Sequence, residues 1–197
     1  MRLTKHINEA MEPLTPDIIN NLMRVNMDYL KDIKHLVSER RHYLQRGTKD
    51  NMEYAVKHVR QDRMPTDSNR DWHDALNAEF QKRFHVNARS QALFCSRVAG
   101  GYAGNTGSTY IIFPIGDFYM LYSSQYPDLY LEQPDYLDMM QPKAEAVVKT
   151  IKKSNDWREV YHDARLVSEI MLICNSYFMI KEKYTAALDE WIKNEVE

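Results

Sequence analysis

In the first quarter of the chain, apolar residues recur at spacings of three and four, at Ile18, Leu22, Val25, Tyr29, Ile33 and Leu36. This spacing places them on one face of an amphipathic helix. Pro16, directly after Thr15, is typical of a first helical turn, and Gly47 is typical of a helix end. We therefore expect one helix from residue 16 to about residue 43, packed on the main body or on a partner.

Other segments show the same helical spacing further along. Apolar residues at Trp72, Leu76, Phe80 and Phe84 predict a helix over about 69–84. Asp67 or Ser68 is a suitable N-cap for it, because a short polar side chain can accept a hydrogen bond from the first turn. Shorter helices are expected at about 142–153, 157–165 and 185–196.

Strand patterns occupy the middle of the chain. Alternation over 53–60 predicts one strand, and apolar runs rich in β-formers predict others. The further strands are expected at 91–96, 110–114 and 117–122. The sequence Pro114-Ile115-Gly116 is a turn signal, so we expect it to join the last two as separate strands.

The run from Glu169 to Ile180 is apolar on both sides of Asn175-Ser176. We interpret it as a bulged strand or a hairpin. A continuous buried helix is the alternative, because periodicity does not assign an apolar run of this kind. With strands at its centre and helices around them, the chain is expected to be an α+β protein. We expect an N-terminal helical segment over 1–48 and a domain over 49–197.

Composition and charge exclude several classes of protein. The 26 Lys and Arg side chains are balanced by 28 Asp and Glu, so the net charge is −2. A protein that binds nucleic acid in general is usually strongly basic, so we do not expect that function. No apolar run approaches the roughly 20 residues that span a bilayer, and the basic start lacks a signal peptide's apolar stretch. We expect a cytoplasmic protein with no membrane partner.

Cys95 and Cys174 lack CxxC spacing, so we expect them to be reduced thiols in the core and expect no metal site.

The common catalytic motifs GxxxxGK, GxGxxG, HExxH and GxSxG are missing from the sequence. Three separate segments carry chemistry instead. The first is Val59-Arg60-Gln61-Asp62-Arg63-Met64-Pro65, at the end of an expected strand. The second runs from Arg89 through Phe94-Cys95-Ser96 to Tyr102 and a glycine-rich stretch. The third is Glu169, at the head of the apolar run.

This order of Arg, then Phe-x-Ser with a downstream Tyr, then Glu before an apolar strand, resembles the ADP-ribosyltransferase-like superfamily over residues 54–180. The resemblance implies a split antiparallel β-sheet core of ADP-ribosyltransferase type, with flanking helices and an N-terminal helix. It also implies that NAD is the substrate, held between the three segments, and that an acceptor macromolecule receives ADP-ribose. It implies no metal.

The resemblance assigns roles to the residues that match. Glu169 would be the catalytic carboxylate and Ser96 would hold the ribose. Tyr102 would stack on the nicotinamide ring. The cofactor-binding arginine is left open among Arg60, Arg63 and Arg89. Members of the family that modify arginine carry Glu or Gln two residues before the catalytic Glu; here that residue is Val167, so arginine as the acceptor is in doubt.

The chemistry of such a site is coherent. An arginine guanidinium matches the oxygens of a pyrophosphate with two parallel hydrogen bonds. Breaking the bond between nicotinamide and ribose develops positive oxocarbenium character on the sugar, as in glycoside hydrolysis. A carboxylate beside that ribose stabilises the charge. Glu169 is the carboxylate that the order of the segments selects for this role.

Two other functions remain open. The chain also resembles tailed-bacteriophage proteins of unassigned role, and an inactive interaction or structural protein on the same fold would dock a partner through the N-terminal helix and the Tyr-rich segment Tyr119–Tyr136. An RNA 2′-phosphotransferase-like enzyme shares the fold and uses several arginines. The small net charge disfavours an RNA substrate.

Overall fold

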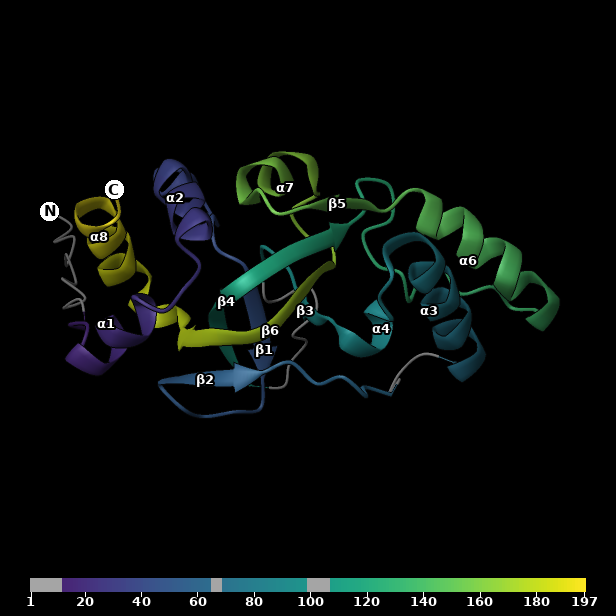
Figure 1. Cartoon of the computed structure of the whole chain (residues 1–197), viewed down its shortest axis with the longest axis horizontal. Coiled ribbons are helices and arrows are strands. Elements are labelled where there is room, and N and C mark those ends of the chain that lie inside the picture. Colours follow the sequence, from purple (N-terminus) through teal and green to yellow (C-terminus); the bar gives the residue numbers. More distant parts are fainter. Residues whose placement is uncertain (1–11, 65–68, 99–106) are drawn as a thin grey trace, which may run out of the picture.

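The computed structural model describes residues 12–64, 69–98 and 107–197. It contains an antiparallel sheet with helices around it, so the expected α+β class is confirmed (Figure 1). The main strand order is β1-β4-β6-β2; β3 also pairs with β6, and β5 pairs with β4. The strands are β1 (Gln45–Thr48), β2 (Tyr54–His58), β3 (Leu93–Cys95), β4 (Ser108–Tyr122), β5 (Lys152–Ser154) and β6 (Ile170–Lys181).

Helices lie at both ends of the long strands and along one side of them (Figure 1). The α-helices are α1 (Pro16–Leu22), α2 (Met27–Leu36), α3 (Arg70–Phe84), α4 (Ala88–Gln91), α6 (Met140–Lys149), α7 (Trp157–Asp163) and α8 (Thr185–Glu195). Short 3-10 turns cover Leu137–Met139 and Glu182–Tyr184. In the part of the chain that the structure describes, no helix combines the length and apolarity needed to cross a bilayer.

Strands β4 and β6 pair from Tyr110↔Lys181 to Tyr122↔Ile170, with a register shift between Ile115 and Phe118. Gly116 lies at this shift with φ 73°, a conformation that glycine adopts without steric cost. The expectation of two strands joined by a turn is therefore wrong. The turn signal marks a β-bulge inside one long strand, because β6 provides pairing partners on both sides of it.

The bulge divides the sheet into two halves. We call the half that contains β1 and β2 the β2 half, and the half that contains β3 and β5 the β3 half. In the β3 half, Ile170 and Leu172 belong to one buried cluster, whereas Met171 belongs to another that includes Leu76 of α3. This alternation is the period of two that a strand imposes, so both faces of the β3 half are covered.

The expected helix over 16–43 is wrong. The chain instead forms α1 and α2 with a break between them, and β1 follows, so that Gly47 lies in a strand rather than at a helix end. The break is caused by distant contacts. The backbone N–H of Asn26 donates to the carbonyl of Pro114 in β4 at 3.0 Å, and the side chain of Asn26 accepts from the N–H of Tyr29. Asn26 thus caps a new helix at the bulge.

The other expected elements agree better with the structure. The helix over 69–84 is confirmed as α3, although its cap is Asn69; Asp67 and Ser68 lie outside the described residues. The strand over 53–60 is confirmed as β2. The run after Glu169 is one strand, β6, so the helical alternative is excluded.

The two cysteines are buried free thiols, as expected. Burial raises the pKa of both Cys95 and Cys174 to about 12. Thiols with pKa values this high stay protonated at neutral pH and are inert.

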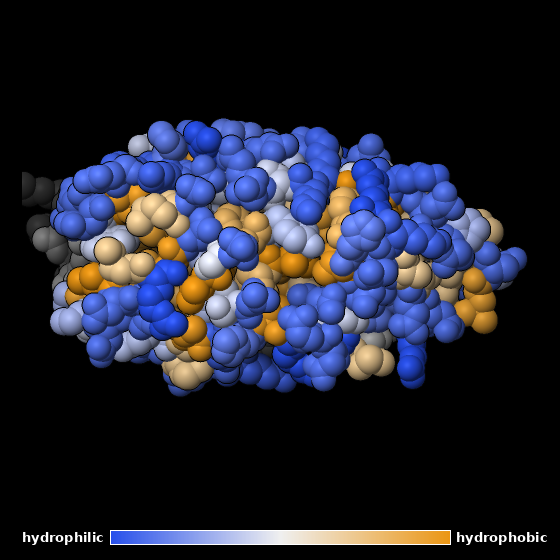
Figure 2. Space-filling view, viewed as in Figure 1, coloured by the Kyte–Doolittle hydropathy of each residue, from blue (hydrophilic) through white to orange (hydrophobic). Residues whose placement is uncertain are grey.

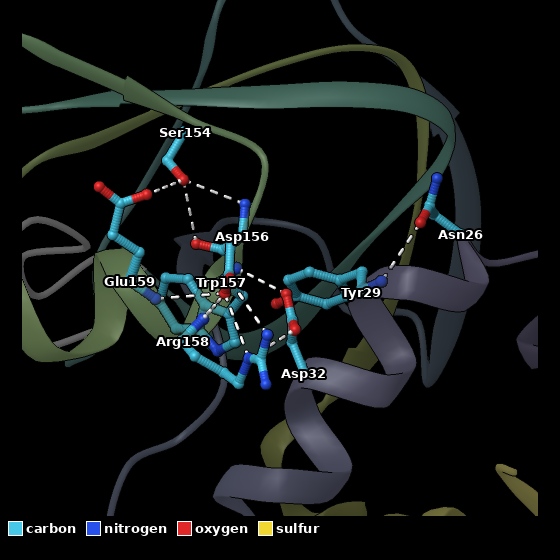
Figure 3. A network of polar contacts seen from close by, with 8 residues as sticks. All are labelled: Asn26, Tyr29, Asp32, Ser154, Asp156, Trp157, Arg158 and Glu159. Carbon is cyan, nitrogen blue, oxygen red and sulfur yellow. Dashed lines mark hydrogen bonds and ion pairs between the residues drawn. The ribbon is translucent and has the colours of Figure 1, made fainter.

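A polar network joins α2 to α7 (Figure 3). Asp32 of α2 accepts a hydrogen bond from the backbone N–H of Trp157 at 2.7 Å. It also forms an ion pair with Arg158, whose Nε lies 3.0 Å from the carboxylate. The indole N–H of Trp157 donates to the carbonyl of His42 at 2.7 Å. Because Trp157 is fully buried, Asp32 fixes both the start of α7 and the position of a core side chain.

We expect Asp32→Ala to lower the free energy of unfolding by about 1.5–3 kcal/mol, because it leaves a buried N–H without its charged acceptor. Asp117→Ala, at an exposed site in the bulge, should change it by no more than about 0.5 kcal/mol. Urea unfolding followed by tryptophan fluorescence measures both. Equal effects of the two substitutions would show that the network contributes nothing.

Candidate functional site

Three arginines from separate segments meet around Phe94 of β3. The Cζ atoms of Arg63 and Arg89 lie 4.3 Å and 4.6 Å from the centroid of the Phe94 ring. Arg46 of β1 donates a hydrogen bond from its guanidinium to the carbonyl oxygen of Phe94 at 2.7 Å. We call these residues together with Glu169 the Phe94 site. Cations over an aromatic face are attracted by its negative quadrupole, so the ring helps to hold two like charges near each other.

Glu169 lies one residue before β6 and pairs with Arg89. Arg89 Nη1 lies 2.6 Å from Glu169 Oε1, and the two side chains are only 12% and 8% exposed. Burial raises the pKa of Glu169, and the positive charges of Arg89 and Arg63 act against this rise. The ionised form of Glu169 therefore depends on its arginine neighbours.

Arg63 is half-buried. Burial, followed by the charges of Arg46 and Arg89, lowers the pKa of Arg63 to about 10, so it is still positively charged at neutral pH. Within the described ranges its guanidinium makes no hydrogen bond or ion pair. A guanidinium carries five N–H donors, and none of those of Arg63 is among the fully buried unpaired atoms, so they are accessible to a ligand. This arrangement suits an anion that supplies acceptor oxygens.

Three polar residues behind the arginines fix their backbone. Ser90 Oγ lies 3.0 Å from His73 Nε2 and accepts from Asn77 Nδ2 at 2.9 Å. Asn77 Oδ1 in turn accepts from the N–H of Arg89, and the carbonyl of Ser90 accepts from the N–H of Arg63. Burial, and then the charge of Arg89, lowers the pKa of His73, which favours a neutral imidazole.

His73, Asn77 and Ser90 were not among the residues expected at the site. Two signals were present. His73 and Asn77 are four residues apart on one helix, which puts them on the same face, and Ser90 directly follows Arg89.

The remaining candidates lie elsewhere or are already engaged. Ser96 is buried, and its hydroxyl donates to the carbonyl of Val98 at 2.7 Å. Ser96 and Glu169 nevertheless flank the last β3–β6 pair, Cys95↔Ile170. Arg60 is 74% exposed and lies 3.5 Å from Asp62. Arg60 contributes instead to a pocket on the β2 half. Tyr102 lies outside the described residues.

Comparisons with protein-family models, curated proteins and solved structures found no match to this chain. Among the described residues, no group of three or more His, Cys, Asp or Glu side chains is placed to hold a metal ion.

We expect Arg89→Met to destabilise the protein in a pH-dependent way. Without Arg89 the pKa of Glu169 rises further above its ordinary value of 4.5. A carboxyl group whose pKa is raised by folding makes the native state less stable as the pH rises from the unfolded pKa to the folded one. Removing one partner of a buried pair costs about 3–5 kcal/mol, so the full loss should appear near pH 8 and a smaller one near pH 5.

Urea unfolding of wild type and variant at both pH values measures this difference. In the double variant Arg89→Met/Glu169→Gln, the pH dependence contributed by Glu169 should disappear. A loss in the single variant that is the same at pH 5 and pH 8 would contradict the argument.

Proposed function

We propose that the chain is an NAD-dependent enzyme resembling the ADP-ribosyltransferases, which transfers ADP-ribose to an acceptor macromolecule that is still to be identified. The observation that supports this most directly is the convergence of Arg63, Arg89 and Glu169. These residues come from three separate segments of the sequence, and they lie together around Phe94. An antiparallel sheet divided by a bulge is compatible with a split-sheet fold of this type.

Arg63 is the residue best suited to a phosphate of NAD. Its guanidinium is half-buried and has no hydrogen-bond partner in the described part of the chain, so the pyrophosphate oxygens would satisfy donors that are otherwise unpaired. Arg89 lies over the same ring and would be the second phosphate ligand. Arg46 adds a third positive charge nearby.

Glu169 supplies the negative charge that the reaction needs. The ribose becomes positively charged as the bond to nicotinamide breaks, and an ionised carboxylate beside it lowers that barrier. In the protein without ligand, Arg89 keeps the Glu169 carboxylate paired at 2.6 Å. Because a guanidinium has five N–H donors, Arg89 can hold a phosphate oxygen while it keeps the Glu169 carboxylate paired and ionised beside the sugar.

Val167 bears on the choice of acceptor. It is 46% exposed and stands two residues before Glu169. An apolar side chain there offers no hydrogen bond to an incoming guanidinium. The acceptor is therefore expected to be a group other than arginine.

A second candidate, a protein that binds a partner without catalysis, is favoured by one observation. Large apolar side chains are exposed in the segment that precedes α6, at Tyr130, Leu131, Tyr136, Leu137 and Met139. Figure 2 shows a small apolar patch at the α6 end of the molecule, amid mostly hydrophilic surface. Contiguous exposed apolar surface is typical of a docking face. This candidate requires no turnover of NAD.

We expect Glu169→Gln to retain the fold and NAD binding but to lose turnover by roughly 10²–10³-fold, the usual effect of removing one electrostatic contact to a transition state. The measurement is nicotinamide release from NAD, with and without cell extract as a source of acceptor. Glu79→Gln is the matched control, since Glu79 is also buried and ion-paired but lies on α3 with Lys82. Equal rates for wild type and Glu169→Gln would remove Glu169 from the mechanism.

We expect Arg63→Met to weaken NAD binding by about 10–100-fold, because it removes charge-assisted hydrogen bonds to phosphate. The melting temperature with and without millimolar NAD reports binding independently of turnover. Arg70→Met, at an exposed position on α3, serves as the control. Wild-type protein whose melting temperature NAD does not change would favour the binding-only candidate.

A further inference from the structure

The β2 half of the sheet carries a second site that the Phe94 site does not use. Alternation along the strands gives this half two different faces. Phe113 points to the face covered by α2, where its ring meets Tyr29 edge-on at 6.2 Å between centroids. The neighbouring residue Ile112 and its partner Met179 point to the opposite face, which forms the floor of a pocket of about 240 Å³.

Cationic side chains surround this pocket. Arg46 of β1, Lys57 of β2 and Arg60 line it, against one carboxylate, Asp50. That carboxylate is already paired with Lys57 at 2.5 Å and accepts the hydroxyl of Thr48. Arg60 is largely solvated and lies 3.5 Å from Asp62, which is even more exposed, and an ion pair between two exposed side chains contributes little. The pocket is therefore positive in a chain whose net charge is −2.

Tyr177 of β6 points to the same face. It is only 7% exposed and lines the pocket, and in the described part of the chain its hydroxyl makes no hydrogen bond. Burial raises the pKa of Tyr177 to about 12, so the hydroxyl is a donor at neutral pH. The Tyr177 hydroxyl is not among the fully buried unpaired atoms of the described residues, so it is open to the pocket and can donate to a molecule that enters it.

We infer that this pocket binds the phosphate monoester of a small phosphorylated molecule. The phosphate would accept hydrogen bonds from Tyr177 and Arg46 and lie near Arg60. The volume is below the roughly 300–1,000 Å³ of sites that take drug-sized ligands. The ligand is thus of the size of a nucleoside monophosphate rather than a dinucleotide.

This inference goes beyond the proposed function and does not require it. Arg46 is the residue that touches both sites, since it lines the pocket and donates to the carbonyl of Phe94. Tyr177 and Arg60 belong to the pocket, whereas Arg63, Arg89 and Glu169 belong to the Phe94 site. Substitutions can therefore separate the two sites.

The test is titration calorimetry of the full chain with AMP, inorganic phosphate and adenosine. AMP and phosphate should bind and adenosine should not. Tyr177→Phe should weaken AMP binding about tenfold or more, because it removes only the donor, and Arg60→Met about 2–5-fold. Tyr130→Phe is the control for Tyr177→Phe, since Tyr130 lies on the exposed segment before α6. Arg70→Met is the control for Arg60→Met, because both arginines are 74% exposed and both lie near an aspartate. Both controls should bind AMP like the wild type.

Arg63→Met distinguishes this pocket from the Phe94 site. If the inference is correct, Arg63→Met leaves AMP binding unchanged even where it impairs NAD binding. AMP binding that Arg63→Met abolishes while Tyr177→Phe and Arg60→Met leave it intact would place the phosphate at the Phe94 site and overturn the inference. Equal binding of adenosine and AMP, or no binding of phosphate and AMP at all, would also overturn it.

Discussion

The pairing of β4 with β6 determines where everything else in this protein lies. The two strands are connected by about 50 residues of intervening chain, yet they pair along nearly their whole length. All four shorter strands attach to one or the other of them. Because neighbouring side chains on a strand point to opposite faces, this single pairing assigns each residue of the ribbon to a core, to the pocket or to a helix. A shift of one residue in register would reverse all of these assignments.

The bulge in β4 is what separates two binding surfaces on one sheet. On one side of it, β3 and the end of β6 bring Phe94 and Glu169 together. On the other side, β1 and β2 flank β4 and β6, and residues of all four strands line the pocket. The bulge also binds the residue that caps α2, since Asn26 donates hydrogen bonds to the carbonyls of both Pro114 and Gly116. The break between α1 and α2 and the bend in β4 are thus one local structure.

The sequence predicted elements whose causes are local. The helix α3 follows from apolar residues at helical spacing, and β6 follows from a long apolar run of β-forming residues. The errors have non-local causes. The helix expected over 16–43 ends early because Asn26 bonds to a strand that lies about 90 residues away in sequence.

The candidate site was likewise predicted only in part from the sequence. The order of charged residues along the chain identified Arg63, Arg89 and Glu169, and these do lie together. Order alone did not reveal that Ser96 donates to its neighbour's carbonyl, nor that Arg60 faces a different pocket, because both depend on backbone direction within a strand or loop. It also missed His73 and Asn77, which have no charge pattern of their own and become relevant only when α3 packs beside Ser90.

Net charge conceals how the charges are arranged. The whole chain is slightly acidic, but the Phe94 site gathers three guanidinium groups against one carboxylate, and the pocket adds Lys57 and Arg60. Arg89 is neutralised by Glu169, so Arg63 and Arg46 provide the surplus charge at the Phe94 site. Arg46 is shared with the pocket, and a cation shared by two anion sites couples them. An anion bound at either site uses part of the attraction of Arg46 and repels an anion at the other site. Under the two proposals, a phosphorylated ligand in the pocket would weaken NAD binding, and NAD would weaken binding of that ligand by the same factor.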